Sequence, residues 1–519
     1  MTTILKLLGK ILYSRDTRAF HLSQERPQES QENCLKRILK RNQDTVYGRR
    51  HGFSSISTPE AFQQKAPLTT YDDMKPYYES ISKGAENILY PDKTYQFMIT
   101  SGTTGRQKYI PLSMYSNIEI RELGKVALAK IFASAKRWDS YKGHSFCFSA
   151  PAVIPQYKYG RYQTGYLTGI LAAKAARRRS LLSSLNRIWP SDEVLNLTDW
   201  ETKMYRVALE IIPRDIRVLT GLPSNLCSFF RGLIDVAAPK MLDDEGVSSK
   251  VRSRLRKAMH RGELHLGKLW PFVDFIAFGG IHIDPYIPFL ESYFGEMQTM
   301  AIYQATEGYL GMQFYDEGIN LTLNYVFFEF IPEDKPDARP RLLTEVKPGV
   351  IYRPIITTSG GFYRYDLGDH IRFTKLNPPT IEIIGRAKTV ASLVGERLQE
   401  EQLVSALRAA CKATGATIGS FTAVPLVTRK RTGYDIYIEF LKAPKDLTEY
   451  EARFDEELRK LNHSYNYERN ADVISPARFI RIKPGTLEKR AAAKHSVDGA
   501  GKVPVVGTPT FVKGLKPIK

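Results

Sequence analysis

A strand-like segment that runs directly into a loop of glycines and hydroxyls constrains the fold of this chain most. The apolar sequence YQFMIT ends at residue 100, SGTTGRQK follows it, and a helical pattern then covers 116–135. Glycines let the backbone approach phosphate oxygens closely, hydroxyls donate hydrogen bonds to them, and Lys108 adds a positive charge. The segment differs from the GxxxxGK[ST] loop of P-loop nucleotidases. By itself it fits a phosphate-binding loop and an ordinary surface turn equally well.

Strand and helix patterns alternate after this loop, which is typical of an α/β domain. Residues 319–358 are instead rich in short alternating strands and predict an antiparallel sheet or barrel. Further strand-like runs that alternate with helical patterns lie near 216–223, 272–280 and 299–308.

The predicted secondary structure is different at the two ends of the chain. Residues 1–95 are predicted to be mainly helical, and from Arg386 the pattern is that of a compact α+β module. A chain of 519 residues is too long for one hydrophobic core. We therefore predict a large N-terminal domain at 1–385 and a small C-terminal domain at 386–519.

Composition narrows the class of protein. The sequence has 43% hydrophobic and 11% aromatic residues, which is a globular composition. Its four cysteines are far apart and form no CxxC pair, which argues against a disulfide framework or a zinc site and fits a reducing compartment. No apolar run approaches the roughly 18 residues of a membrane span. Lys6 and Lys10 interrupt the apolar N-terminal run, so it predicts an amphipathic helix packed on the body, or resting on a membrane, rather than a signal peptide. We expect a cytoplasmic protein.

The formal net charge is +20, from 75 Lys and Arg against 55 Asp and Glu. Such a surplus can serve nucleic acid, an anionic membrane or an acidic substrate such as ATP. The sequence contains no RNA-binding motif, so a solvated basic surface is the favoured interpretation. A basic nucleic-acid-binding protein without enzymatic activity remains an alternative.

Three further segments carry polar residues in places that suit chemistry. Thr306 and Glu307 follow a strand, and the carboxyl ends of strands are where α/β sheets bind ligands. The glutamate could hold Mg²⁺ together with substrate phosphates, although an N-cap threonine and a solvated glutamate would also explain the pair. Asp369 follows another strand and could accept both hydroxyls of a ribose. The sequence GRAK at 385–388 falls at the predicted boundary, where a hinge would lie.

In this order, the segments resemble the adenylate-forming superfamily of acyl-CoA synthetases, luciferases and peptide-synthetase adenylation domains. Within it the chain is most similar to the acyl-acid amido synthetases, which include the plant enzymes that conjugate auxin or jasmonate to amino acids and their bacterial relatives. The resemblance covers nearly the whole chain and includes TSGTTGRQKYIP, the leader FQQKAPLTTYDDMKPYYESISKGAENILYPD, GLPSNL, FGG and GRAKTVASLVGERLQEEQL. The chain departs from it at Asn225, where many bacterial relatives have tryptophan, and at Val505, which replaces an arginine in GAGKVPVV.

The resemblance implies a ligase that uses ATP and Mg²⁺ to activate a carboxylic acid as an acyl-adenylate and then transfers the acyl group to an amine, expected to be an amino acid. It implies catalytic roles for Lys108, Glu307 and Lys502, with Glu307 as the Mg²⁺ ligand, and a hinge at Lys388 about which the small domain rotates. The residues implied to contact ATP or AMP are Ser101, Gly102, Thr103, Thr104, Gly105, Gly279, Gly280, Tyr303, Thr306, Asp369 and Arg386. We expect a monomer.

Two alternatives stay open within this fold. The acyl acceptor could be a thiol such as coenzyme A, or the fold could be degenerate and serve only as a binding module. The sequence does not identify the acid, but the aromatic stretch 157–166 is a candidate lining of the acyl pocket.

Overall fold

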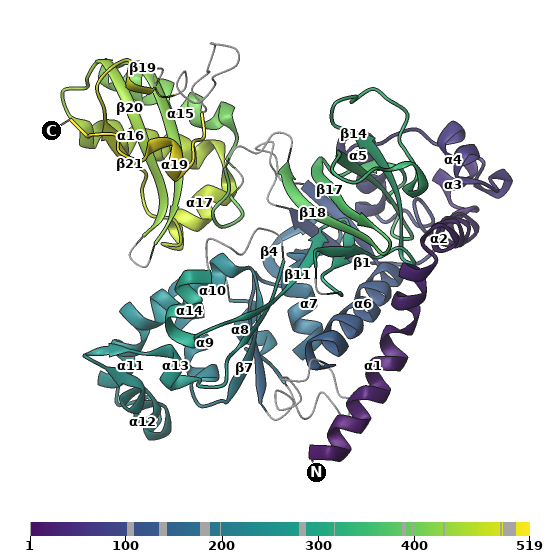
Figure 1. Ribbon diagram of the computed structural model, residues 1–519, viewed down its shortest axis with the longest axis horizontal. Coiled ribbons are helices and arrows are strands. Elements are labelled where there is room, and N and C mark those ends of the chain that lie inside the picture. Colours follow the sequence, from purple (N-terminus) through teal and green to yellow (C-terminus); the bar gives the residue numbers. More distant parts are fainter. Residues whose placement is uncertain are drawn as a thin grey trace.

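The structure, a computed structural model, describes residues 2–100, 108–133, 143–176, 187–197, 199–279, 287–315, 317–386, 391–396, 398–428, 431–487, 490 and 505–518. Within these ranges the chain has the predicted mixed α/β fold, with a large N-terminal part and a small α+β part at the C-terminus (Figure 1). The C-terminal part lies at the upper left of Figure 1, and the helices of residues 27–82 lie on the right.

Five helices form the N-terminal segment, as its mainly helical pattern predicts. Thr45 and Thr58 cap two of them by accepting hydrogen bonds from first-turn N–H groups. Pro27 begins a third helix, where its missing N–H group would have had no partner within the helix. The helices are α1 (Thr2–Glu25), α2 (Pro27–Asn42), α3 (Val46–Arg50), α4 (Pro59–Lys65) and α5 (Tyr71–Ser82), with a 3₁₀ turn at Phe53–Ser55.

Helix α1 packs on the body of the protein through its second half. Tyr13 stacks on Phe314 with ring centroids 6.3 Å apart, and Phe20 lies 4.6 Å from the same ring. The sequence predicts this packing; the side chains of residues 1–12 lie outside the described ones. No helix within the described ranges is both long and apolar enough to cross a membrane.

A four-stranded sheet carries the predicted phosphate-loop segment. Its order is β2-β1-β5-β4, in which β1 and β2 are antiparallel and their paired ends, Thr100 and Lys108, flank residues 101–107. The strands are β1 (Thr94–Thr100), β2 (Lys108–Ser113), β4 (Ile154–Tyr159) and β5 (Tyr162–Gly165). The predicted helix follows β2 as α6 (Met114–Ala133).

The second sheet has twelve strands within the described residues. Along its main path the order is β14-β15-β17-β18-β13-β12-β11-β10-β7-β3-β6, and β16 pairs with β15. The half from β11 to β6 is parallel, and the half from β12 to β14 is antiparallel where the alternating pattern predicts it. The strands are β3 (His144–Phe148), β6 (Ile188–Trp189), β7 (Ile216–Gly221), β10 (Phe275–Gly279), β11 (Gln298–Ala305), β12 (Gly308–Met312), β13 (Ile319–Leu321), β14 (Val326–Pro332), β15 (Ile351–Thr358), β16 (Tyr365–Asp366), β17 (Asp369–Leu376) and β18 (Pro379–Arg386).

Helices cover the parallel half of this sheet and bury an aromatic core. Phe146 of β3 packs 5.0 Å from Phe229, and Trp270 is fully buried 6.1 Å from Phe230. The helices are α7 (Leu167–Ala176), α8 (Asp192–Leu195), α9 (Trp200–Ile211), α10 (Pro223–Gly232), α11 (Ala238–Asp243), α12 (Ser249–Ala258), α13 (Leu266–Leu269) and α14 (Ile287–Phe294). A π-helical turn (Leu233–Ala237), a 3₁₀ turn (Leu343–Glu345) and the short hairpin β8 (Met259–His260) and β9 (Glu263–Leu264) complete the large part.

The C-terminal part has its own sheet and hydrophobic core. The sheet order is β19-β20-β21, and buried Ile436 and Ile438 pack with Tyr450 and Phe454. Its elements are α15 (Glu400–Thr414), β19 (Thr417–Val427), β20 (Thr432–Lys442), α16 (Leu447–Leu461), α17 (His463–Asn470), β21 (Arg478–Arg481) and α19 (Pro509–Val512). A separate core is compatible with the predicted boundary at residue 385, which stays a prediction.

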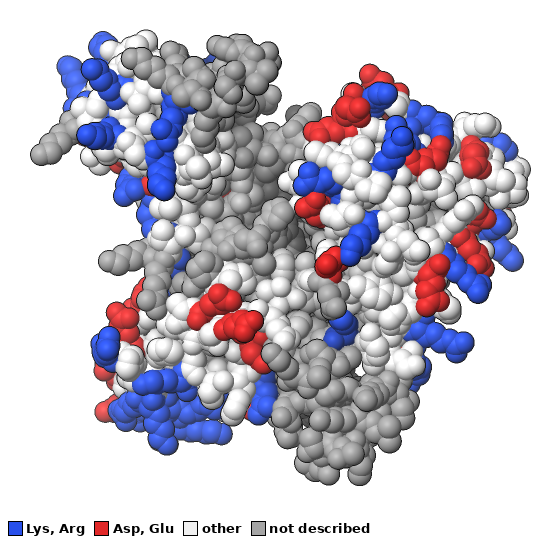
Figure 2. All heavy atoms as spheres, in the orientation of Figure 1, with Lys and Arg blue, Asp and Glu red and all other residues white. Residues whose placement is uncertain are grey.

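The basic surplus is unevenly spread over the surface. Figure 2 shows Lys and Arg gathered at the lower left, where Figure 1 places α12. This helix carries no acidic residue and five basic ones, Lys250, Arg252, Arg254, Arg256 and Lys257.

Candidate active site

Two residues predicted to contact ATP or AMP, Gly279 and Tyr303, lie at the carboxyl ends of two neighbouring parallel strands. Gly279 ends β10 and lies beside Ile302 of β11, in parallel register. Tyr303 is the next residue of β11, which continues to Ala305 before the Thr306–Glu307 turn. The structure therefore brings Gly279, Tyr303, Thr306 and Glu307 to one edge of the sheet, where α/β folds bind ligands.

Tyr303 and Asp369 are joined by a buried hydrogen bond. The Tyr303 hydroxyl donates to Asp369 Oδ2 over 2.8 Å, and the two residues are only 4% and 7% exposed. Asp369 begins β17 and is the register partner of Arg386 at the end of β18. Three predicted nucleotide-contacting residues thus come together from segments that are far apart in the sequence.

Glu307 lies in the turn between β11 and β12, beside two tyrosines. The Tyr365 hydroxyl donates a hydrogen bond to Glu307 Oε1 over 3.2 Å. Tyr78 of α5 is fully buried, and burial together with the negative charge of Glu307 raises the pKa of its phenol. Neither tyrosine was assigned a role from the sequence.

The N-terminal leader holds the segment that carries Tyr365. Thr69 donates its backbone N–H to the Arg364 carbonyl over 2.9 Å, and the Thr69 carbonyl accepts from the Asp366 N–H over 2.8 Å. The two backbones pair as in a parallel bridge between Thr69 and Tyr365. The leader therefore supports the segment whose Tyr365 contacts Glu307, a role that the sequence did not indicate.

Arg364 anchors this segment from inside the protein. Its guanidinium pairs with buried Glu329 at 2.9 Å and donates to the carbonyls of Gln63 and Ala66 at 2.9 and 2.7 Å. Its φ of 46° is left-handed, a conformation that is uncommon for a residue with a side chain. Five hydrogen-bonding contacts to Glu329 and the leader hold it there.

Lys108 lies on the same side of the molecule as Glu307. Its ammonium is 5.1 Å from the Tyr71 ring centroid, and the Tyr71 hydroxyl accepts a hydrogen bond from the Tyr109 N–H over 3.0 Å. Tyr71 in turn packs 5.9 Å from Tyr78, the neighbour of Glu307. One run of tyrosines thus connects the start of β2 to the Thr306–Glu307 turn.

A small cavity of about 30 Å³ opens behind this turn. Thr306 and Glu307 line one side, and buried Glu119 of α6 lines another. Burial raises the pKa of Glu119 to about 7, against the opposing effects of the Ser359 hydroxyl that donates to it and of Arg37 at 3.5 Å. Glu119 has no sequence motif around it, and sequence reasoning missed it.

Several predicted site residues lie outside the described ranges, and their roles stay predictions. They are Ser101, Gly102, Thr103, Thr104, Gly105, Gly280, Lys388 and Lys502. The backbone of Arg386 is described, and its side chain is not. Within the described part of the chain, no three His, Cys, Asp or Glu side chains form a group that could hold a metal ion.

The cysteines show no sign of a nucleophile. Cys147 and Cys227 are buried, and burial raises the pKa of the Cys227 thiol to about 12. A thiol with a raised pKa is protonated at neutral pH, so both side chains pack as small apolar groups.

The aromatic stretch 157–166 forms the β4–β5 hairpin and the chain after it. Tyr159 stacks on Tyr109 with ring centroids 4.4 Å apart. Tyr166 lies near Glu468 of the C-terminal part, and burial raises the pKa of its phenol to about 12. The role of this stretch in binding an acyl group stays a prediction.

Comparison with known proteins identifies the family. Residues 16–299 match the GH3 family N-terminal domain, 319–386 the GH3 family central domain and 401–508 the GH3 family C-terminal domain.

Individual relatives are similar over most of their length. The indole-3-acetic acid-amido synthetase GH3.8 of Oryza sativa subsp. indica is 24% identical, over 88% of this chain and 84% of the relative. The jasmonoyl–L-amino acid synthetase GH3.5 of Oryza sativa subsp. japonica is 23% identical, over 93% and 92%. The solved structure of the AtGH3.15 acyl acid amido synthetase in complex with 2,4-DB has the same fold, with a TM-score of 0.62, 21% identity and coverage of 96% and 95%. The resemblance inferred from the sequence motifs is thereby confirmed, and the chain belongs to the GH3 family.

Proposed function

We propose that this protein is an ATP-dependent acyl-acid amido synthetase that forms an acyl-adenylate and transfers its acyl group to an amino acid. The observation that carries the proposal is the meeting of two remote segments at the end of β11. The Tyr303–Asp369 hydrogen bond joins two buried side chains that would contact the nucleoside, and the Tyr365–Glu307 hydrogen bond holds the carboxylate of the turn that follows β11. Membership of the GH3 family supports the same activity.

In the first half-reaction, a carboxylate oxygen of the acid attacks the α-phosphorus of ATP and pyrophosphate leaves. Both reactants are anions, so the site must neutralise charge as it moves from the acid to the leaving group. Lys108 directly follows the predicted phosphate loop in the chain and would supply positive charge there. Asp369 would accept the ribose hydroxyls, Tyr303 would contact the base, and Thr306 would donate to a phosphate oxygen.

The donor set at Glu307 fits Mg²⁺. Glu307 Oε1 is held by Tyr365, while no described residue donates a hydrogen bond to Oε2. Mg²⁺ is commonly bound by one or two carboxylates together with substrate phosphates, which agrees with the single carboxylate here. When bound, the ion would neutralise charge on the phosphates.

In the second half-reaction, the amine nitrogen attacks the acyl carbon and AMP leaves. The acyl-adenylate is already activated, so this step needs positioning and access rather than a protein nucleophile. We propose that the small domain from residue 386 rotates about Lys388 between the two steps and brings Lys502 to the site for adenylation. This rotation would break the described contacts between the two parts: Arg231 of α10 donates to the Thr432 hydroxyl over 2.7 Å and to the Thr428 carbonyl, Val427 packs against the core of the large part, and Tyr166 lies near Glu468.

The relatives guide the choice of substrates. The two rice relatives are named for indole-3-acetic acid and for a jasmonoyl group, each conjugated in an amide. We propose a small, largely apolar carboxylic acid as the acyl donor and a free amino acid as the acceptor. We also propose a monomer in the cytoplasm, where four unpaired cysteines would be stable.

Pyrophosphate release tests the proposal. Purified protein with ATP and Mg²⁺ should release pyrophosphate only when a suitable carboxylic acid is present, and release should rise when amino acids are added. Coenzyme A in place of amino acids should give no such rise. A rise with coenzyme A alone would establish a thiol acceptor, and no release with any acid would overturn the proposed activity.

A further inference from the structure

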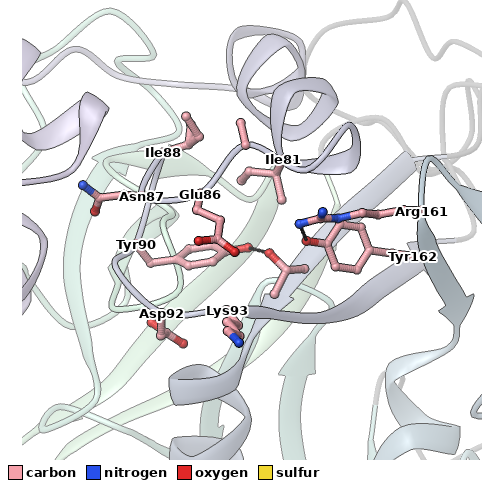
Figure 3. A pocket seen from close by; sticks show the side chains of 11 residues that line it. Ile81, Glu86, Asn87, Ile88, Tyr90, Asp92, Lys93, Arg161 and Tyr162 are labelled. Carbon is pink, nitrogen blue, oxygen red and sulfur yellow. Dashed lines mark hydrogen bonds between the residues drawn. The ribbon is translucent and has the colours of Figure 1, made fainter.

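A pocket of about 300 Å³ lies outside the site described above. Its walls are the loop after α5, the start of β1 and the tip of the β4–β5 hairpin (Figure 3). Strand β1 begins here at Thr94 and ends at Thr100, beside the predicted phosphate loop. Six residues of strand span about 20 Å, so the pocket and that loop lie at opposite ends of β1. The volume is within the range of small-molecule sites.

The pocket brings together three charged side chains that form no ion pair with a described residue, although Arg161 donates to the Gly84 carbonyl at 3.3 Å and to the Tyr162 hydroxyl at 3.2 Å. In Figure 3 the guanidinium of Arg161 enters from one side and the carboxylate of Glu86 from the other, with Lys93 at the lower edge. No described residue forms an ion pair or hydrogen bond with the side chain of Glu86 or of Lys93. Asp92, by contrast, is already paired with Arg41 at 2.8 Å and accepts from the Tyr115 N–H over 2.7 Å. The charges open to a ligand are therefore two positive and one negative.

Backbone contacts fix the position of Arg161. Its N–H donates to the Ser82 carbonyl over 3.1 Å, and its Nη2 donates to the Gly84 carbonyl over 3.3 Å. A Cβ atom at Gly84 would lie 2.7 Å from Arg161 Nη1, and one at Gly160 would lie 2.1 Å from the Ser82 carbonyl oxygen. Both glycines also have positive φ. The hairpin tip can approach the end of α5 this closely because Gly160 has no side chain to meet the Ser82 backbone.

The opposite wall, which carries Glu86, is pinned in the same way. Asn87 has a φ of 55°, its carbonyl accepts from the Val46 N–H over 2.9 Å, and its side chain donates to the Asp44 carbonyl over 3.0 Å. The Tyr47 N–H donates to the Ile88 carbonyl over 3.0 Å. Both walls are thus held by the backbone before any ligand arrives, which lowers the entropic cost of binding.

We propose that this pocket is a second small-molecule site, and that it binds an acidic α-amino acid. A carboxylate of the ligand pairs with Arg161 through a charge-assisted hydrogen bond from Nη1, because Nη2 already donates to the Gly84 carbonyl and the Tyr162 hydroxyl. The ligand ammonium pairs with Glu86, and the second carboxylate lies near Lys93. Tyr162, whose hydroxyl accepts from Arg161, and Thr94, whose hydroxyl is hydrogen-bonded to that of Tyr90 at 2.7 Å, line the same space, while Ile81 supplies an apolar surface.

Calorimetric titration of the whole protein tests this site, without ATP or acid so that no acyl-adenylate forms. Glutamate should bind more tightly than glutamine, which lacks the second carboxylate. Arg161→Gln should weaken glutamate binding about tenfold or more, as loss of a charged hydrogen-bonding partner does. Glu86→Gln should weaken glutamate binding to a similar extent, and should leave or improve the binding of glutarate, which has two carboxylates and no ammonium.

The control is Lys83→Gln, which removes a nearby exposed positive charge that does not line the pocket. It should leave glutamate binding unchanged, and melting curves of all variants should match the wild type because the substituted side chains are exposed. The proposal is overturned if the wild type does not bind glutamate, or if Arg161→Gln and Glu86→Gln bind it as the wild type does. If both variants bound glutamate as the wild type does, the glutamate would be bound at the amino-acid site of the proposed reaction instead. Acid-dependent pyrophosphate release does not require this pocket, so failure here leaves the proposed activity standing.

Discussion

The Tyr365 hydroxyl donates a hydrogen bond to Glu307 Oε1 over 3.2 Å, and so ties the turn after β11 to a segment that the N-terminal leader holds in place. The relationship gives the leader a function in the proposed chemistry. Tyr365 would act as a positioning residue that orients Glu307, and the backbone of Thr69 in the leader would hold the segment of Tyr365.

Tyr365→Phe should lower the adenylation rate about tenfold, a typical effect of losing a residue that orients a metal ligand. The Mg²⁺ concentration needed for half-maximal rate should rise, because Glu307 loses the bond that orients it. Pyrophosphate release over a Mg²⁺ titration measures both quantities. Tyr363→Phe is the matched control, since its hydroxyl donates to the Leu89 carbonyl instead. If both variants showed the same Mg²⁺ dependence, Tyr365 would have only a structural role.

Asp369→Asn should raise the KM for ATP about tenfold, as expected when a charged hydrogen-bond acceptor is lost. The KM for the acid should change little, because Asp369 contacts Tyr303 at the proposed nucleoside corner. Steady-state kinetics with each substrate varied in turn separates the two constants. Equal increases in both would place Asp369 outside the nucleoside site.

Glu119 should make stability depend on pH. Burial raises its pKa from 4.5 to about 7 in the folded protein, so the folded state favours the protonated form. A carboxyl whose pKa is raised by folding stabilises the protein fully below the unfolded pKa, and this contribution is lost as pH rises from about 4.5 to about 7. The loss is at most about 3.5 kcal/mol, at about 1.4 kcal/mol for each pKa unit.

Melting temperatures of the wild type and Glu119→Gln, measured from pH 4.5 to 8, test this expectation. The variant should gain stability relative to the wild type as pH increases, since it cannot ionise. Parallel curves across the range would show that Glu119 titrates normally.

Breaking the buried Arg364–Glu329 pair should be costly. Glu329→Gln leaves a buried guanidinium without its counter-charge, and such changes destabilise proteins by about 3–5 kcal/mol. Denaturant unfolding measures the change. Glu317→Gln breaks the exposed pair with Lys375 and should leave the unfolding midpoint unchanged. A midpoint for Glu329→Gln equal to that of the control would show that the anchor contributes nothing.

Local sequence patterns predicted much of the fold. The strands at β1, β7, β10 and β11 follow from apolar runs that end at turn-forming residues, and such signals need no knowledge of the partner strands. Strand β19 was not predicted, because its sequence TIGSFTAVPLV contains glycine and proline, which weaken a strand pattern. Its long antiparallel pairing with β20 stabilises it nonetheless.

The candidate site was only partly predictable, because local sequence patterns do not show which remote residues meet. Thr306, Glu307 and Asp369 stand after strands, and that position can be read locally. Tyr365 and Glu119 cannot be recognised in this way, because their surroundings come from Thr69 and Ser359, which are remote in the sequence. The second pocket likewise joins residues 81–94 to a hairpin about seventy positions later.

Oxygen transfer from a labelled acid shows whether the acid is activated as an acyl-adenylate. The protein would be given ATP, Mg²⁺, an amino acid and a carboxylic acid labelled with ¹⁸O in both carboxyl oxygens, and the products would be analysed by mass spectrometry. Activation through an acyl-adenylate predicts AMP that carries one ¹⁸O and an amide that keeps the other, because the acid oxygen that attacks phosphorus leaves with AMP. Unlabelled AMP, or label found in inorganic phosphate beside ADP, would contradict it.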